Sequence, residues 1–266
     1  MAATFRLVIA DEDAAYARQA AAEAFAELDR IEARLSRFAE GSDIWRINRL
    51  RAGEAAFVQH DTLECLRLAE QVRLATAGAF NIAYASPCHA APQRFILDEA
   101  SHTLRVLGEG VRLDLGGIGK GFALDRMAAL LREWETASVL LCASTSTLLA
   151  LDPPRGEEGW AVEFGPDDAP QRLMLANLAL SASGLGARGS HIVDPRTGRP
   201  AESRRRAWAI APTAALADAL STALLVMTDA ELRACHDRCR NAAPGRNRRG
   251  GPIQSSVSNT ECPMSR

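Results

Sequence analysis

The sequence feature that most constrains this chain is the glycine-rich stretch Val111–Asp125, VRLDLGGIGKGFALD. Val111–Leu115 predicts a strand, Gly116–Gly121 a turn, and the segment Phe122–Glu135 a helix. Backbone amides at a helix N-terminus attract anions, phosphates above all, and Lys120 would add a positive charge there. The stretch therefore predicts a junction that is able to hold a phosphate group.

This stretch differs from two familiar phosphate-binding motifs. Lys120 is followed by Gly121, which excludes a Walker A loop, and Phe122 stands where a dinucleotide-binding motif carries its third glycine. Two interpretations remain open. The stretch is either a phosphate-binding turn or a strand–turn–helix junction that needs glycine for its positive φ angles.

A second informative stretch is the polar segment Ser181–Pro200, SASGLGARGSHIVDPRTGRP, which predicts a loop. Its DPRTG portion has the composition of a turn, because proline restricts φ and glycine accepts the left-handed conformation. His191 lies just before this turn. A lone histidine of this kind is either a hydrogen-bonded structural residue or a functional group, and the loop by itself favours the structural role.

A third stretch, Ala217–Ala223, reads ADALSTA within a predicted helix over 214–226. Asp218 and Thr222 are four residues apart, so both lie on one face of the helix, with Ser221 one step away. A carboxylate with hydroxyl groups supplies the hard oxygen ligands that suit Mg²⁺. The same residues would also serve as a helix-surface pair in a capping network, and both interpretations stay open.

The remaining pattern mixes strands and helices without strict β–α–β alternation, which predicts an α+β fold. Residues 4–237 are expected to form one domain, and the polar, Pro- and Gly-rich residues 238–266 a disordered or aberrant tail. Residues 36–48 predict a loop with a short helix. Other helices are expected over 13–35 and 61–76, and other strands over 4–10, 94–97, 103–107, 160–164, 173–180 and 207–210, with an apolar, β-prone run over 138–151.

Composition excludes several classes of function. The formal net charge of −2 and an aromatic content of 5% favour neither nucleic-acid binding nor a stacking platform for single strands. No apolar run reaches membrane-spanning length, and the N-terminus lacks the pattern of a signal peptide, so a cytoplasmic protein is expected. The six cysteines are scattered without a CxxC pair, which favours reduced thiols.

Together, the three stretches resemble the ApbE family of flavin transferases. DLGGIGKG, SASG…SHIVDPRTG and ADALSTA are similar to that family's DLGGIAKGYAxD, STSG…HIIDPRTG and ADALSTA segments, in the same order. More weakly, LSRFAEGSDIWRIN resembles LSxYxxxSEISRLN, and GAFNIA at Gly78–Ala83 resembles GAFDPT. The resemblance runs from about Thr4 to Met227, which is most of the chain.

The resemblance implies an α+β domain around an FAD cleft, and an enzyme that transfers FMN from FAD to a Thr or Ser hydroxyl of an acceptor protein, releasing AMP. It implies a Mg²⁺ site formed by the Gly119 carbonyl, Asp218, Ser221 and Thr222. His191 becomes the candidate base for the attacking hydroxyl, oriented by Asp194 unless that residue only caps its turn. The FAD contacts would be Phe38, Gly78, Ala79, Phe80, Gly116, Lys120, Phe122 and Ile192.

Four departures from the family pattern bear on activity. The N-terminal MGT motif appears as MAAT, GAFDPT has become GAFNIA with Asn81 and Ala83, and AGGD is replaced by Ala143–Ser146, which removes a carboxylate. After ADALSTA, a helix from Asp229 runs into the polar tail with no strand predicted, as a frameshift or truncation would produce. These departures support an alternative, a degenerate member that binds or hydrolyses FAD without transferring FMN.

The tail suggests an alternative of another class. Cys235, His236 and Cys239 place two thiols and an imidazole within five residues, but no second ligand pair follows, so a zinc site is disfavoured. An arginine cluster over 238–249 is expected to be a solvated segment rather than a nucleic-acid arm. The partner implied by the main interpretation is instead a protein that carries the Thr or Ser flavinylation site.

Overall fold

An antiparallel sheet organises the part of the chain that the computed structural model describes, residues 3–87, 93–166, 168–184, 193–201, 204–234 and 255–256. Neighbouring strands of this sheet all pair antiparallel. Their order is β1 (Phe5–Ile9), β5 (Val139–Ala143), β6 (Thr147–Ala150), β9 (Leu178–Gly184), β10 (Arg206–Ala211) and β11 (Ser255–Ser256). Side chains alternate between the two faces of such strands, so each face needs its own cover.

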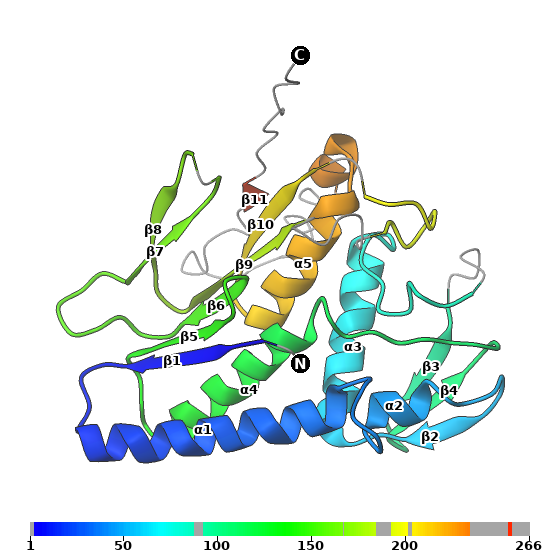
Figure 1. Cartoon of the computed structure of the whole chain (residues 1–266), viewed down its shortest axis with the longest axis horizontal. Helices are drawn as coiled ribbons and strands as arrows, with labels where there is room; N and C mark the ends of the chain where they lie inside the picture. The colour runs from blue at the N-terminus through cyan, green and yellow to red at the C-terminus, as the bar shows by residue number, and fades with distance from the viewer. Residues whose placement is uncertain are drawn as a thin grey trace.

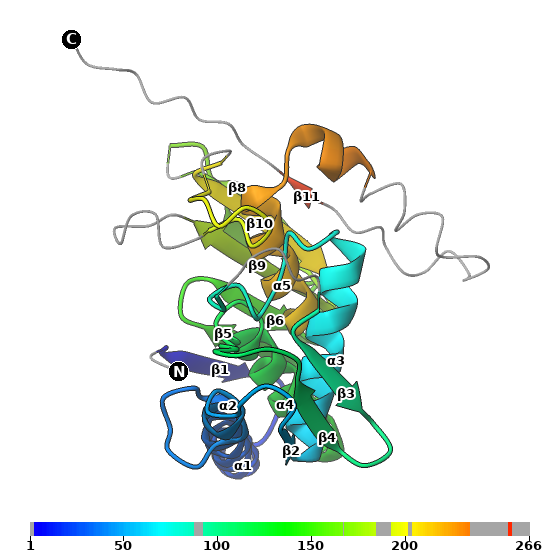
Figure 2. The same ribbon diagram turned by 90° about the vertical axis from the view of Figure 1, so that its right-hand side faces the viewer.

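Two helices, α4 (Gly119–Glu133) and α5 (Ala214–Val226), cover one face of the sheet (Figure 1). Helix α1 (Ala14–Leu35) packs on α4, and α3 (His60–Ala75) packs on α5. Helix α5 therefore lies between the sheet and α3 (Figure 2). The main hydrophobic core fills the space between these layers and includes the fully buried Met127, Leu131 and Leu141.

The opposite face of the sheet carries the hairpin of β7 (Trp160–Phe164) and β8 (Gln171–Leu175). A second, smaller hydrophobic cluster lies between this hairpin and the sheet, formed by Ala150, Val162, Leu175, Leu180 and Trp208. The sheet is thus buried on both faces at β6, β9 and β10. Ser146, in the turn before β6, and Ala182–Gly184, at the end of β9, reach the candidate site described below.

A small sheet of β2 (Ala55–Phe57), β4 (Thr103–Val106) and β3 (Phe95–Asp98) lies beside the short helix α2 (Asp43–Ile47). The Ser42 hydroxyl accepts from the Trp45 amide and so caps α2, and it donates to the Ser36 carbonyl at 2.6 Å. The buried Asp43 carboxylate accepts from the Thr62 hydroxyl at 2.6 Å, which ties α2 to α3. These bonds hold the loop over 36–42 in place.

Helices α4 and α5 meet at their N-terminal ends through a direct backbone contact. A Cβ atom added at Gly121 would lie 2.6 Å from the Ala215 nitrogen and closer still to the Ala214 carbonyl, so only glycine fits there. One turn further along α4, the Asp125 carboxylate accepts from the amides of Ala214 and Ala215 at 2.8 and 2.9 Å. Asp125 thereby caps α5 from a neighbouring helix.

The α+β prediction is confirmed, and most predicted elements are present, including the short helix within 36–48. The predicted strand over Val111–Leu115 is wrong. Its backbone groups bond to loops and side chains instead of a neighbouring strand: the Leu113 amide donates to the Asn48 side chain at 2.6 Å, and the Asp114 amide donates to the Ile82 carbonyl at 2.8 Å. The segment is extended, but it belongs to none of the sheets that the described residues form.

Three boundaries also differ from the sequence predictions. The single strand predicted over Leu173–Leu180 divides into β8 and β9, because Asn177 turns the chain with a φ of 52°. The first residues of the predicted loop, Ser181–Gly184, belong to β9, and the helix expected from Phe122 begins at Gly119. In the tail, where no strand is predicted, β11 pairs with Trp208 and Ala209; the rest of 238–266 lies outside the described residues.

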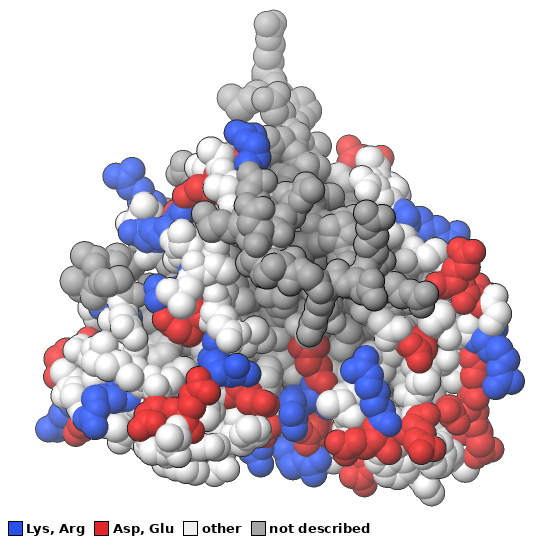
Figure 3. Space-filling model, turned by 180° about the vertical axis from the view of Figure 1, so that it is seen from behind, with Lys and Arg blue, Asp and Glu red and all other residues white. Residues whose placement is uncertain are grey.

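Surface charge on the described residues is mixed. On the face shown in Figure 3, acidic and basic side chains lie interspersed over the described part of the surface. Among the helices that the structure describes, none has the length and apolarity required to cross a bilayer.

The backbone contact at Gly121 predicts a strong effect of one methyl group. We expect Gly121→Ala to lower the free energy of unfolding by about 2 kcal/mol or more, because α4 and α5 must move apart. Gly108→Ala is the matched control, since its added Cβ meets nothing within 4 Å and its φ is outside the left-handed region. Urea unfolding of both variants measures the difference. Equal stabilities would contradict the proposed contact.

The cap at Asp125 predicts a pH dependence of stability. Burial, the largest cause, raises the pKa of Asp125 to about 6, against the two amide hydrogen bonds that lower it. The pKa of Asp125 in the folded protein lies above the ordinary value of 3.8, so protonation of its carboxyl group favours the folded state. This contribution to stability is fully present below about pH 4 and is lost as the pH rises through about 6. Between about pH 4 and pH 7, we expect the free energy of unfolding of the wild type to fall by about 2 to 3 kcal/mol relative to that of Asp125→Asn.

Denaturant unfolding of the wild type and Asp125→Asn at pH 4, 5, 6 and 7 tests this expectation. Because both proteins share every other titrating group, their difference isolates the carboxyl group of Asp125. A difference in stability that stays constant over the four pH values would mean that Asp125 titrates as an ordinary carboxyl group.

Candidate functional site

A cavity of about 710 Å³ opens beside the start of α4, between segments that are far apart in the sequence. Its volume is within the range of small-molecule sites, roughly 300 to 1,000 Å³. Several residues that the family resemblance implies as ligand or metal contacts line it: Phe38, Ala79, Phe80, Gly116, Gly119, Lys120, Asp218 and Thr222. The structure thus brings the separate sequence motifs to one place.

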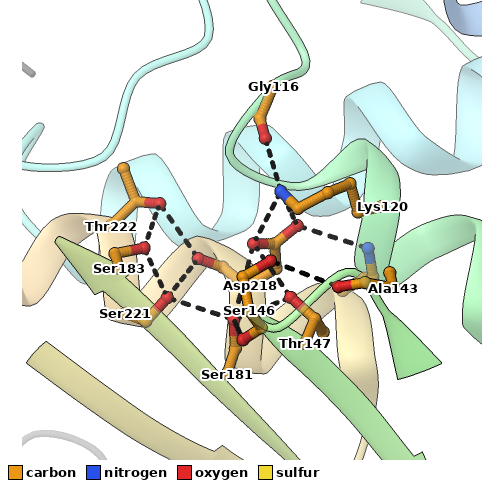
Figure 4. A network of polar contacts seen from close by, with 12 residues as sticks. Gly116, Lys120, Ala143, Ser146, Thr147, Ser181, Ser183, Asp218, Ser221 and Thr222 are labelled. Atoms are coloured by element: carbon orange, nitrogen blue, oxygen red, sulfur yellow. Dashed lines mark hydrogen bonds and ion pairs between the residues drawn. The ribbon is translucent and has the colours of Figure 1, made fainter. Parts of the chain in front are cut away.

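Asp218 is the buried anion of this cavity, with 2% of its surface exposed. Figure 4 shows its carboxylate directed from α5 toward the start of α4, where the Lys120 Nζ lies 3.2 and 3.3 Å from its two oxygens. The Gly121 amide donates to Oδ2 at 3.3 Å, and the Thr147 hydroxyl donates to Oδ1 at 3.4 Å. A salt bridge and neutral donors together compensate the burial of this charge.

A cluster of hydroxyl groups surrounds the Asp218 carboxylate. The Ser221 and Thr222 hydroxyls both donate to the Asp218 carbonyl, at 2.9 and 3.1 Å, as helical serine and threonine often do. The Ser183 hydroxyl on β9 lies 2.8 Å from that of Ser221 and 3.3 Å from that of Thr222 (Figure 4). Thr222 and Ser183 line the cavity, whereas Ser221 is fully buried behind them.

The glycine-rich turn is shaped by close contacts with these groups. The Asp114 carboxylate accepts from the Gly116 amide at 2.9 Å, and the Lys120 Nζ donates to the Gly116 carbonyl at 2.9 Å. A Cβ added at Gly117 would lie 3.0 Å from the Thr222 Oγ1 and 3.3 Å from the Phe80 ring. Glycine at this position therefore allows the turn to lie directly against the hydroxyl of Thr222.

A second polar group, Arg37, Tyr84 and Asp114, also lines the cavity and is missed by the sequence analysis. The Tyr84 hydroxyl donates to Asp114 Oδ2 at 3.1 Å, and the Arg37 Nε lies 3.4 Å from the same oxygen. Burial and the neighbouring carboxylate raise the pKa of Tyr84 to about 12. Tyr84 is therefore a neutral hydrogen-bond donor at ordinary pH.

Phe38 provides an exposed aromatic surface among the cavity-lining residues. Phe38 is 77% exposed, and the Arg37 guanidinium lies 4.2 Å from the centroid of its ring. Covering an apolar side chain that is this exposed removes apolar surface from water, which favours the binding of a ligand there. A planar ring system is a suitable ligand for such a surface, because aromatic rings stack in offset arrangements.

Some predicted site residues lie elsewhere. Gly78, with a φ of 82°, precedes the lining residue Ala79 without lining the cavity itself, and the buried Phe122 does not line it either. His191 and Ile192 lie outside the described residues, as do Cys235, His236, Cys239 and the arginine cluster of the tail. The assigned roles of all these residues stay predictions.

Two departures from the family pattern lie at the cavity. Asn81 lines it, and its side-chain oxygen accepts from the Ala83 amide at 2.9 Å. Ser146, where the family pattern has the carboxylate, also lines the cavity and bonds to the Ala143 carbonyl. The turn between β5 and β6 is made by Ser144, which has a φ of 53°. Hydroxyl groups thus replace an acidic side chain at this position.

The residues present fit a Mg²⁺ ion that is shared with a phosphate ligand. Within the described residues, no group of three or more His, Cys, Asp and Glu side chains is arranged to hold a metal by itself. Asp218, the Thr222 hydroxyl and the main chain at Gly119 are hard oxygen donors on one cavity. Mg²⁺ commonly takes one or two carboxylates and completes its ligands with substrate phosphates and water.

Comparison with protein families gives a match between residues 1–243 and the model of the ApbE family. Two curated relatives are both named FAD:protein FMN transferase. The protein of Klebsiella pneumoniae is 28% identical over 149 residues, which cover 50% of this chain and 44% of the relative. That of Escherichia coli K12 is 32% identical over 133 residues, or 43% of this chain and 36% of the relative. The matched region spans less than half of these relatives.

Solved structures share the fold. The flavinyl transferase ApbE of Pseudomonas stutzeri, in its apo form, superimposes with a TM-score of 0.75 at 23% identity, covering 89% of this chain and 88% of the other. The flavin transferase ApbE of Vibrio cholerae gives a TM-score of 0.77 at 21% identity, with 90% and 88% coverage. At these identities the likeness establishes the architecture.

The packing of Gly117 predicts a defect in ligand binding without a defect in folding. We expect Gly117→Ala to weaken the binding of FAD, the ligand that the resemblance implies, by about tenfold, because the methyl group displaces Thr222 or the turn. Quenching of flavin fluorescence in the presence of Mg²⁺ measures this affinity, with Gly108→Ala as the control. Unchanged affinity would show that the ligand does not use this end of the cavity.

Proposed function

The chain belongs to the ApbE family, and from that premise we propose that it is an FAD:protein FMN transferase. It would use Mg²⁺ and FAD to attach FMN to a threonine or serine hydroxyl of an acceptor protein, with release of AMP. The substrate is thus a dinucleotide with a planar flavin ring, and the partner is a protein that carries the hydroxyl group.

The observation that carries this proposal is the meeting of the motifs on one cavity. Segments at 36–38, 79–82, 114–120 and 218–222 are widely separated in the sequence, and all contribute lining residues. One part of the lining is polar, with Lys120 and Asp218 at the glycine-rich turn, and another part presents Phe38 and Phe80. A polar region beside aromatic surface suits a ligand that joins a diphosphate to flat rings.

The polar region would hold the diphosphate. Main-chain groups of the turn at the start of α4 and the ammonium of Lys120 are suited to phosphate oxygens. Gly119, Asp218, Ser221 and Thr222 are the proposed Mg²⁺ ligands. When bound, the metal supplies neutralisation of the charge that develops on the diphosphate during transfer.

The transfer is a substitution at the FMN phosphorus. The acceptor hydroxyl oxygen bonds to that phosphorus, the bond from the phosphorus to the bridging oxygen of the diphosphate breaks, and AMP leaves with the oxygen. The hydroxyl proton passes to a base, for which His191 is the proposed residue, since imidazole titrates near neutral pH.

Asp194 supports the turn that follows His191 in the sequence. Its carboxylate accepts from the Arg196 amide at 2.9 Å and from the Arg196 guanidinium at 2.7 and 2.8 Å. Burial raises the pKa of Asp194, but the combined contacts with Arg196 outweigh it and lower that pKa below its ordinary value. The carboxylate is therefore engaged within the DPRTG turn. This favours the capping role for Asp194 over that of a partner to the base.

The proposed function predicts Mg²⁺-dependent labelling of an acceptor. Purified protein with FAD, Mg²⁺ and a flavinylation-motif acceptor should release AMP and give a fluorescent acceptor band on a denaturing gel. Asp218→Ala should lower the rate by about 100-fold or more, because it removes the buried carboxylate of the metal site. Chelation by EDTA should abolish labelling, and Asp29→Ala, on the exposed surface of α1, should leave it unchanged.

The same assay separates the alternative function. Asn81 and Ser146 occupy cavity positions where the family pattern has carboxylates, which favours a member that binds or hydrolyses FAD without transfer. Release of AMP with no labelled acceptor would support that alternative. Absence of both FAD binding and AMP release would refute the proposed function.

A further inference from the structure

Lys120 is the only lysine among the 31 lysine and arginine residues of the sequence. Its Nζ contacts both oxygens of Asp218, at 3.2 and 3.3 Å, and donates to the Gly116 carbonyl at 2.9 Å (Figure 4). The Lys120 side chain is 21% exposed and that of Asp218 3% exposed. The single lysine therefore lies at the edge of the cavity, and its ammonium forms an ion pair with the buried carboxylate of Asp218.

The ion pair supplies the charge that the buried carboxylate needs. Among the described residues, the other groups that contact the Asp218 carboxylate are neutral: the Gly121 amide and the hydroxyls of Thr147 and Ser181. A buried carboxylate without a counter-charge is costly, so the ammonium stabilises the protein while the cavity holds no ligand.

The ammonium occupies the atoms that the proposed metal site requires. Both oxygens of Asp218 face Lys120, and Gly119 and Thr222 line the same cavity. Two cations at contact distance from one carboxylate repel each other strongly where little water screens them. A divalent ion that binds Asp218 therefore competes with the ammonium for the carboxylate, and a second anion nearby would favour release of the ammonium.

We propose that Lys120 holds the place of the divalent cation on Asp218 until a diphosphate enters the cavity and takes up the ammonium. This inference rests on the proposed function and adds a mechanism by which metal and FAD bind cooperatively. The four-carbon stem of lysine allows the ammonium to move between the carboxylate and a phosphate oxygen. Each ligand then strengthens the binding of the other by the same factor, since such coupling is reciprocal.

The choice of lysine fits this role. A guanidinium at position 120 would form two parallel hydrogen bonds with the Asp218 carboxylate, which is a stronger and more rigid pairing. An ammonium is a compact charge, which separates from the Asp218 carboxylate more readily than a guanidinium would. Every other basic position in the chain has arginine, so the exception coincides with the position where a replaceable cation is required.

The single lysine makes a direct measurement possible in the wild-type protein. Labelling with [¹⁵N]lysine gives one side-chain ammonium signal, which reports Lys120 alone. We expect Mg²⁺ without FAD to leave this signal unchanged at concentrations where Mg²⁺ with FAD shifts it. A shift of the same size at the same Mg²⁺ concentration without FAD would overturn the inference.

A second experiment measures the coupling with Mn²⁺ as the metal probe, followed by the electron paramagnetic resonance of free Mn²⁺. Without FAD, Lys120→Met should bind Mn²⁺ about tenfold more tightly than wild type, and FAD should strengthen Mn²⁺ binding less in the variant than in wild type. Arg18→Met, which removes one exposed charge on α1, is the control for net charge and should behave as wild type.

The outcomes separate this inference from the proposed function. If Lys120→Met and wild type bind Mn²⁺ equally without FAD while FAD strengthens Mn²⁺ binding in both, the place-holding role is wrong and the proposed function stands. If neither protein binds Mn²⁺ or FAD, both proposals fail. Circular dichroism of Lys120→Met confirms that the variant is folded when these affinities are compared.

Discussion

The close backbone contact between α4 and α5 is the constraint on which the candidate site depends. Gly121 lets the two helices meet at their first turns, and Asp125 holds that meeting point by capping α5. Lys120 is the residue before the contact, and Asp218 lies about one turn into α5. Main-chain packing therefore brings the backbones of Lys120 and Asp218 close together, and the flexible lysine stem carries the ammonium to the carboxylate. A buried charge pair needs such support, because its net contribution to stability depends on good geometry.

Much of this arrangement follows from local patterns in the sequence. The spacing of Asp218 and Thr222 places them on one helix face, and the glycines before Phe122 indicate a helix start that faces an anion. These inferences depend on residues that are neighbours in the chain, and the structure places those residues on one cavity. The order of the motifs adds what spacing alone does not, since it relates distant segments through resemblance to a family.

Other features depend on contacts that no local pattern encodes. Val111–Leu115 has the composition of a strand, yet its hydrogen-bond partners include the side chain of Asn48, 65 residues away in the sequence. Arg37, Tyr84 and Asp114 come from three separate segments and meet only in the folded protein. Asp114 belongs to a recognisable motif and offered a signal, whereas Arg37 and Tyr84 offered none. Where a residue forms its hydrogen bonds with residues distant in the sequence, hydrophobic periodicity predicts the wrong secondary structure or misses the site.

The turn between β5 and β6 places a serine in a backbone conformation that favours glycine. Ser144 adopts the left-handed conformation that glycine accepts at little cost, and the resembling family has glycine at this position. Serine here implies a small local strain that the strands on either side, paired with β1 and β9, impose on the turn. Such a turn is a site where evolution can exchange polar groups at the cavity wall while the scaffold keeps its shape. The motif has lost a carboxylate at this position, and Ser146 presents a hydroxyl group to the same cavity instead.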